Sequence, residues 1–175
     1  MSKDKKIIIF DTTLRDGDQA SKHTIRYQKK IDLAWQLYNL GVDVIEAGFP
    51  ISSNGDWKAV HQISSEVGKE GNIIICGLSR AVDADIESAA SALDPAKNPR
   101  IHTFIATSDI HIEKKLKSTR ERILEKAVLA VQKAKSYMDD VEFSLEDFGR
   151  TDPDYALRVI ESVIRAGGSV LLNER

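Results

Sequence analysis

Cysteine is nearly absent from this chain of 175 residues. The one cysteine, Cys76, excludes an internal disulfide and is typical of a reducing compartment, so we expect a cytoplasmic protein. Cys76 lies inside the apolar run NIIICGL, where a small core residue is commoner than a nucleophile. No apolar run approaches the ~20 residues that span a bilayer. The charged start MSKDKK is not followed by the apolar segment of a secretory signal. We therefore expect no membrane partner.

An excess of either charge is also missing. The chain has 25 Lys and Arg residues against 27 Asp and Glu residues, which gives a net charge of -2 at pH 7. This balance argues against nucleic acid as a partner, because proteins that bind it carry strongly basic surfaces. The basic stretch HIEKKLKSTRER at residues 111–122 is interrupted by acids, and a solvated helix surface explains it.

No linker rich in proline, glycine or serine divides the chain, so we expect one domain over residues 1–175. Apolar strand-like runs alternate with helical patterns along its whole length. Gly41 should end the first helix, and Asp152 should cap the last one ahead of Pro153. The expected strands are residues 7–14, 42–49, 72–79, 100–108 and 140–147, with a sixth starting in 169–174, and the expected helices are 24–40, 55–67, 84–93, 120–137 and 151–167.

Regular βα alternation predicts an α/β fold with a parallel sheet. An open doubly wound sheet usually carries a glycine-rich phosphate loop after its first strand, and neither GxGxxG nor GxxxxGK[ST] occurs here. Polar residues instead recur near the carboxyl ends of successive strands, as in a catalytic (β/α)8 TIM barrel. A complete barrel takes roughly 250 residues. We therefore expect a partial barrel, with about the first five to six βα units.

The polar residues at the strand ends are the candidate site. Arg15 and Asp16 follow the first strand, Glu46 lies in the second, and His102 lies in the fourth with Ser108 six residues further on. Ser144 and Glu146 share one face of the fifth strand, because side chains alternate along a strand.

The chemistry of these groups suits a keto acid. The Asp16 carboxylate offers oxygen to a hard divalent cation. The Arg15 guanidinium can stabilise an oxyanion, with Glu46 orienting it, while His102 can bind a carboxylate or relay a proton.

Each of these groups also has a structural interpretation. The RDGD motif is common in solvated surface turns, and a histidine in an apolar strand is often a satisfied core residue. Ser144 can be an ordinary small polar residue, and Glu146 can cap the helix that follows.

Four segments carry a family resemblance: DTTLRDGDQA, VIEAGFP, HTFIATSDIH and FSLEDFGRTD. Together they resemble the acetyl-CoA-dependent Claisen condensing enzymes of the DRE-TIM metallolyase family, which is related to HMG-CoA lyase. The match runs from Ile7 to about Gly167. Within the family it is strongest with enzymes that act on 3-methyl-2-oxobutanoate in leucine biosynthesis. A homocitrate-forming or citramalate-forming relative and a lyase remain alternatives.

The resemblance implies specific roles. Arg15 and Glu146 are the catalytic residues, Asp16 is a ligand of a divalent metal ion (Mn, Mg or Zn), and acetyl-CoA is the co-substrate. The resemblance assigns substrate binding to four further residues: Gln19, Glu46, His102 and Ser144.

The sequence departs from the family's pattern in its remaining metal ligands. The family uses a His-x-His pair and an asparagine on later strands, and no histidine follows His111 here. We therefore expect the 175-residue chain to be inactive by itself. We also expect it to form a homo-oligomer, because unpaired strand edges demand a partner. A non-catalytic, self-associating half-barrel is the alternative from another functional class.

Overall fold

The computed structural model describes residues 7–20 and 25–171. Two compact units divide the chain. The first holds the residues up to Gly77 together with Ala92–Pro99, and the second holds Leu78–Ser91 and the residues from Arg100 onward. Within the described ranges, no helix is both long and apolar enough to cross a membrane.

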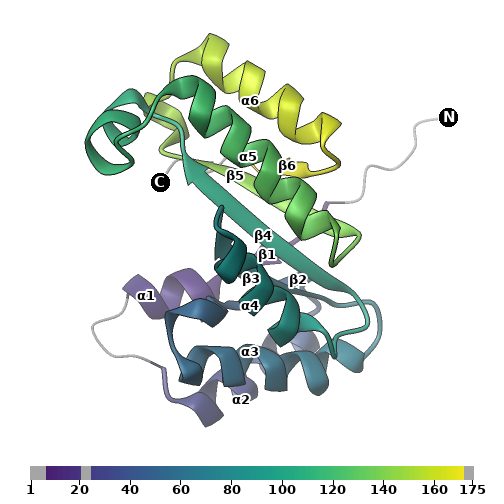
Figure 1. Cartoon of the computed structure of the whole chain (residues 1–175). Helices are drawn as coiled ribbons and strands as arrows, with labels where there is room; N and C mark the ends of the chain where they lie inside the picture. The colour runs from purple at the N-terminus through teal and green to yellow at the C-terminus, as the bar shows by residue number, and fades with distance from the viewer. Residues whose placement is uncertain (1–6, 21–24, 172–175) are drawn as a thin grey trace, which may run out of the picture. The chain divides into compact units, whose positions relative to one another are not determined.

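The first unit consists of βα repeats whose strands are parallel, in the order β1-β2-β3. Its helices α2 and α3 pack against each other (Figure 1). Gly41 ends α2 with a φ of 84°, a left-handed conformation that glycine adopts without a Cβ clash. Its elements are β1 (Phe10–Asp11), η1 (Thr13–Gly17), α1 (Asp18–Ala20), α2 (Tyr27–Leu40), β2 (Val44–Gly48), η2 (Pro50–Ser52), α3 (Asn54–Ser65), η3 (Val67–Lys69) and the start of β3 (Ile74–Arg80).

The first strand is shorter than the sequence predicts. The apolar run that begins at Ile7 indicates a buried strand, but β1 covers only Phe10–Asp11. Ile7, Ile8 and Ile9 are 79%, 60% and 52% exposed. The Ile9 carbonyl still accepts hydrogen bonds from the amides of Asp43 and Val44, so the backbone runs along β2 on one side. The prediction of burial is wrong because hydrophobicity alone does not say whether a layer covers a strand.

The second unit continues the pattern with strand order β3-β4-β5-β6. The pairs β4/β5 and β5/β6 are parallel. Asp152 caps α6 by accepting the Tyr155 amide at 2.9 Å, as the sequence predicts. In Figure 1, α5 lies beside α6. The elements are the end of β3, α4 (Asp83–Leu93, whose last residues belong to the first unit), β4 (Pro99–Ala106), η4 (His111–Lys115), α5 (Arg120–Lys135), β5 (Asp140–Glu146), η5 (Phe148–Arg150), α6 (Pro153–Arg165) and β6 (Ser169–Leu171).

Burial follows the predicted periodicity. In α3 and η3, Val60, Ile63 and Val67 are fully buried, as helical spacing predicts. One predicted site position differs from the structure. Ser108 lies beyond β4, which ends at Ala106, so its predicted place on the strand is wrong. Of the segments expected at 24–40 and 169–174, Thr24 and residues 172–174 lie outside the described residues.

Candidate active site

A tight helical turn presents Arg15 and Asp16 directly after β1. The backbone carbonyl of Thr12 accepts the amides of Arg15, Asp16 and Gly17 at 3.2, 2.8 and 3.2 Å. Asp11 fixes the start of this turn, since its carboxylate accepts the Thr13 amide at 2.9 Å and the Thr13 hydroxyl at 3.2 Å. An Asp that bonds the backbone two residues on is a common turn-forming device. The charged motif is therefore a turn that backbone and side-chain hydrogen bonds hold in one conformation.

Glu46 holds the Arg15 side chain. The Nε atom of Arg15 donates to Oε2 of Glu46 at 2.6 Å, and Nη1 donates to Oδ1 of Asp16 at 3.0 Å. The Glu46 side chain is fully buried on β2, and the Arg15 side chain is 11% exposed. A buried carboxylate needs such a charge-assisted partner. The structure thus brings together three of the predicted site residues, with the guanidinium between two carboxylates.

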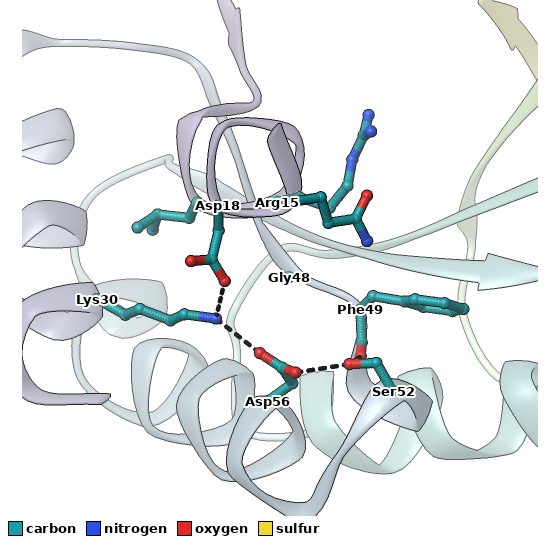
Figure 2. A pocket seen from close by; sticks show the side chains of 9 residues that line it. Arg15, Asp18, Lys30, Gly48, Phe49, Ser52 and Asp56 are labelled. Atoms are coloured by element: carbon teal, nitrogen blue, oxygen red, sulfur yellow. Dashed lines mark hydrogen bonds and ion pairs between the residues drawn. The ribbon is translucent and has the colours of Figure 1, made fainter. Parts of the chain in front are cut away.

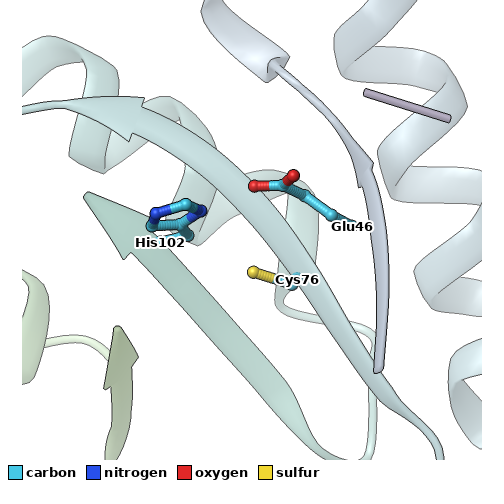
Figure 3. Close-up of side chains that lie close together, drawn as sticks. All are labelled: Glu46, Cys76 and His102. Carbon is cyan, nitrogen blue, oxygen red and sulfur yellow. The ribbon is translucent and has the colours of Figure 1, made fainter. Parts of the chain in front are cut away.

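Glu46 also has a thiol as its neighbour across the sheet. Cys76 on β3 is the register partner of Glu46, and a carboxylate oxygen of Glu46 lies within 4.8 Å of Sγ. Figure 3 labels both side chains, together with His102 of the second unit. Hard divalent cations prefer oxygen ligands to sulfur. Buried Cys76 is therefore a poor ligand for such an ion, and it fits the core position that the sequence predicts. The Asp16 carboxylate, in contrast, offers the oxygen that such an ion prefers.

A cavity of about 270 Å³ opens beside the turn. Gln19 of α1 lines it, as does Arg15, so two predicted site residues share one cavity. Lys30, reaching between Asp18 and Asp56, forms a second charged group in its wall (Figure 2). A Cβ atom at Gly48 would lie only 3.0 Å from the Val60 side chain, so this wall of the cavity favours a glycine. The full lining is Leu14, Arg15, Asp18, Gln19, Lys30, Gly48, Phe49, Ser52 and Asp56.

In the second unit, His102 and Ser144 form a buried pair. The Nε2 atom of His102 and Oγ of Ser144 lie 2.6 Å apart, and the two residues are 2% and 3% exposed. They come from β4 and β5, where Phe104 is the register partner of Ser144. This bond pairs Nε2 of His102 with the Ser144 hydroxyl, an arrangement that fits a core role as well as a substrate-facing role.

Glu146, the last residue of β5, forms an ion pair with Lys115 of η4. Both carboxylate oxygens are engaged, at 2.9 and 3.3 Å from Nζ. The Glu146 side chain is 28% exposed, so a substrate can reach it.

The neighbouring Asp147 organises the loop between β4 and α5. Its buried carboxylate accepts from the Ser108 hydroxyl, from Nδ1 of His111 at 2.9 Å and from Nε of Arg150 at 2.8 Å. Arg150, Ser108 and His111 together lower the pKa of Asp147 to about 2, against the opposing effect of burial. With φ at 65°, Asp147 also adopts a left-handed conformation. These contacts tie η4 to the end of β5 beside Glu146.

Sequence reasoning missed three charged residues near the predicted site residues: Lys30, Lys115 and Asp147. Lys30 is one helical turn before Ala34 on the apolar face of α2, so its helical position was a usable signal. Lys115 and Asp147 had no comparable signal, because residues distant in sequence provide their contacts.

Comparisons with known proteins point to one family. A model of the HMGL-like family matches residues 6–172. The chain is 55% identical over 166 residues to a 2-isopropylmalate synthase of Thermosynechococcus vestitus, covering 95% of this chain and 31% of the relative. It is 52% identical over 172 residues to the enzyme of the same name from Prochlorococcus marinus strain MIT 9215, covering 98% and 32%. The chain thus spans about a third of the length of these curated relatives.

A solved structure has the same fold. The crystal structure of Bacillus subtilis HMG-CoA lyase superposes with a TM-score of 0.76 at 20% sequence identity. The match covers 96% of this chain and 58% of the lyase chain. The predicted fold class is therefore confirmed as α/β with part of a TIM barrel.

Proposed function

This chain belongs to the HMGL-like family, and on that premise we propose that it supplies part of the active site of a 2-isopropylmalate synthase. The proposed reaction condenses acetyl-CoA with 3-methyl-2-oxobutanoate in leucine biosynthesis, in the cytoplasm. The acetyl methyl group loses a proton, its carbon forms a bond to the keto carbon, and the keto oxygen gains a proton. Hydrolysis of the thioester then releases the CoA thiol. The observation that carries this proposal is the Arg15 guanidinium held between Glu46 and Asp16 at the end of β1.

Arg15 is the proposed catalytic residue of the first unit. Negative charge develops on the keto oxygen during carbon–carbon bond formation, and a preorganised guanidinium stabilises it without reorganisation. Buried Glu46 engages Nε and Asp16 engages Nη1, so the guanidinium is held in a fixed direction beside the proposed reaction site. Asp16 is the proposed ligand of a divalent metal ion, whose chemistry is to polarise the keto acid. Gln19, in the wall of the same cavity, is a proposed substrate contact.

The second unit contributes three further proposed residues. His102 and Ser144 offer a fixed pair of polar atoms for the substrate carboxylate. Glu146 is proposed to act near the reacting centre, where the ion pair with Lys115 holds its carboxylate in place.

A domain replacement tests the proposed function. The matching third of the T. vestitus relative is replaced by this chain, and release of the CoA thiol is measured with acetyl-CoA, Mn²⁺ and a panel of 2-keto acids. We expect turnover that depends on the metal and is fastest with 3-methyl-2-oxobutanoate. A folded chimera without thiol release contradicts the proposal, and a preference for pyruvate or 2-oxoglutarate replaces it with a sister synthase.

The isolated 175-residue chain is the second arm of this test. A hard cation needs several ligands, and Asp16 supplies one. We therefore expect no thiol release above the buffer blank with this chain alone. Measurable turnover would show that the chain, by itself or by self-association, completes a site.

A further inference from the structure

Lys30 is a buried cation outside the proposed catalytic residues. Its side chain is only 4% exposed, and its ammonium lies 2.8 Å from Asp18 and 2.6 Å from Asp56. Burial lowers the pKa of Lys30, but the bonds to both carboxylates outweigh this, so its pKa lies above the ordinary value. The group is therefore charged at neutral pH, in the wall of the cavity that Arg15 lines.

Asp18 connects Lys30 to the turn that carries the proposed catalytic arginine. Asp18 begins α1, and its amide donates to the backbone carbonyls of Arg15 and Thr13. Its carboxylate accepts the Ile25 amide at 2.6 Å as well as the Lys30 ammonium. The turn is thus anchored at one end by Asp11 and at the other by Asp18.

Asp56 connects the same ammonium to a rigid support. It lies in the first turn of α3 and accepts the hydroxyls of Ser52 and Ser53 at 2.6 and 2.8 Å. Ser53 in turn caps α3 by accepting the Asp56 amide at 3.0 Å. Asp56 therefore has several bonds that do not depend on Lys30, and its pKa lies below the ordinary value despite burial.

We propose that Lys30 is a positioning residue, which acts through Asp18 to hold the turn where Arg15 meets Glu46. The proposal rests on the proposed function of Arg15. A buried ion pair contributes little net stability compared with apolar packing, because desolvation of the charges offsets their attraction. Its effect is to fix geometry. Displacing a catalytic group by 1 Å can cost roughly 100-fold in rate, so a bond between α2 and the catalytic turn has a direct consequence for turnover.

The first test uses the 175-residue chain and needs no activity. The ¹⁵N spectrum of the arginine side chains reports the Nε–H group of Arg15, which is assigned by its loss in Arg15→Lys. The bond to Glu46 should protect this proton from exchange with solvent. In Lys30→Met, which keeps side-chain length but removes the charge, we expect its exchange to become at least about tenfold faster.

Two further variants separate positioning from stability. Asp18→Asn weakens the link to the turn and leaves the Lys30–Asp56 pair, so it should accelerate Arg15 exchange as Lys30→Met does. Asp56→Asn weakens the link to α3 and should leave the exchange within about twofold of wild type. Equally faster exchange of the Arg15 Nε–H proton in both aspartate variants would overturn the proposal, because Lys30 would then stabilise the whole region and not the turn in particular. If Lys30→Met fails to fold, the two aspartate variants decide.

Arg100→Met is the matched control. Arg100 is also a cation shared by two carboxylates, at 2.9 Å from Asp140 and 2.8 Å from Glu142, and its side chain is 15% exposed. This cluster lies in the second unit, at the start of β4 and β5. Removing it should cost comparable stability and leave Arg15 exchange unchanged. Faster exchange in Arg100→Met would mean that any lost ion pair loosens the turn, which contradicts a specific role for Lys30.

A kinetic measurement uses the chimera with the T. vestitus relative. Lys30→Met should lower kcat on the order of 100-fold while changing KM for the keto acid less than about threefold, since positioning acts on the transition state. An unchanged kcat in a folded, active chimera would overturn the proposal. An inactive wild-type chimera would contradict the proposed function alone, because the exchange measurement would still decide whether Lys30 positions Arg15.

Discussion

At the scale of single residues, the arrangement of the Arg15 guanidinium is the most specific feature of the candidate site. Two of its nitrogens are already engaged, by Glu46 and by Asp16, in a fork that an ammonium group cannot reproduce. In the chimera, Arg15→Lys should therefore lower kcat by roughly 100- to 1000-fold. Steady-state thiol release measures this. The exposed Arg26→Lys is the control, and wild-type kinetics in Arg15→Lys would remove the residue from the mechanism.

Asp16 gives a second prediction at this scale. It is proposed to be an anionic oxygen ligand, so Asp16→Asn should weaken Mn²⁺ binding to the chimera by more than about tenfold. Isothermal titration measures the affinity directly, independently of turnover. Asp32→Asn, an exposed change of the same charge on α2, should bind Mn²⁺ like the wild type. Equal affinities in the two variants would show that Asp16 is not a ligand.

At the scale of elements, both ends of η4 are bonded to the end of β5 and the residue directly after it. His111 at its start bonds Asp147, and Lys115 at its end bonds Glu146. Asp147 also bonds Ser108 and Arg150. It does so in a left-handed conformation that costs an ordinary residue about 1 kcal/mol or more. Such a residue persists where its side chain over-determines the geometry. The loop thereby orients Glu146 at the end of its strand.

The bonds of Asp147 to Ser108, His111 and Arg150, called the Asp147 clamp below, predict that stability falls at low pH. Because the pKa of Asp147 is lowered to about 2, its ionised form stabilises the fold fully above the unfolded value of 3.8. This contribution is lost as the pH falls from about 4 towards 2. Urea unfolding of the chain between pH 7 and 2.5 should show it. Asp147→Asn, which tolerates the same backbone, should be less stable at pH 7 and lose less on acidification. Parallel pH profiles would contradict the clamp.

At the scale of the whole molecule, the exposed apolar start of the chain predicts association. Ile7, Ile8 and Ile9 are more than half exposed, and they lead into β1, which pairs only with β2 among the described strands. Exposed apolar strand edges recruit a second chain. Light scattering of the isolated chain should show dimers or larger species. Ile8→Lys places a charge on this edge and should favour the monomer, whereas a wild-type monomer at high concentration would contradict the prediction.

The sequence determined the order of elements and most of the core. Hydrophobic periodicity at Val60, Ile63 and Val67, the glycine after α2 and the Asp152–Pro153 start of α6 are local signals, so they predict local structure correctly. The same reasoning placed Glu46 in the second strand and paired it with Arg15 in function. It failed at Ile7–Ile9 and Ser108, where the outcome depends on which layer covers a strand and where pairing stops.

Only the tertiary structure decided which charges meet. Lys30 bonds two aspartates that lie 12 and 26 positions away, Lys115 bonds Glu146 across 31 positions, and Asp147 bonds His111 across 36. Ion pairs have no sequence period, because any cation can serve any carboxylate that folding brings within reach. The sequence thus identifies the groups that can react, and the fold brings Glu46, 31 positions away, to the Arg15 guanidinium. The physical reason is that a charge pair becomes strong only where the fold removes both groups from water and places them in contact. The sequence does not show where that happens.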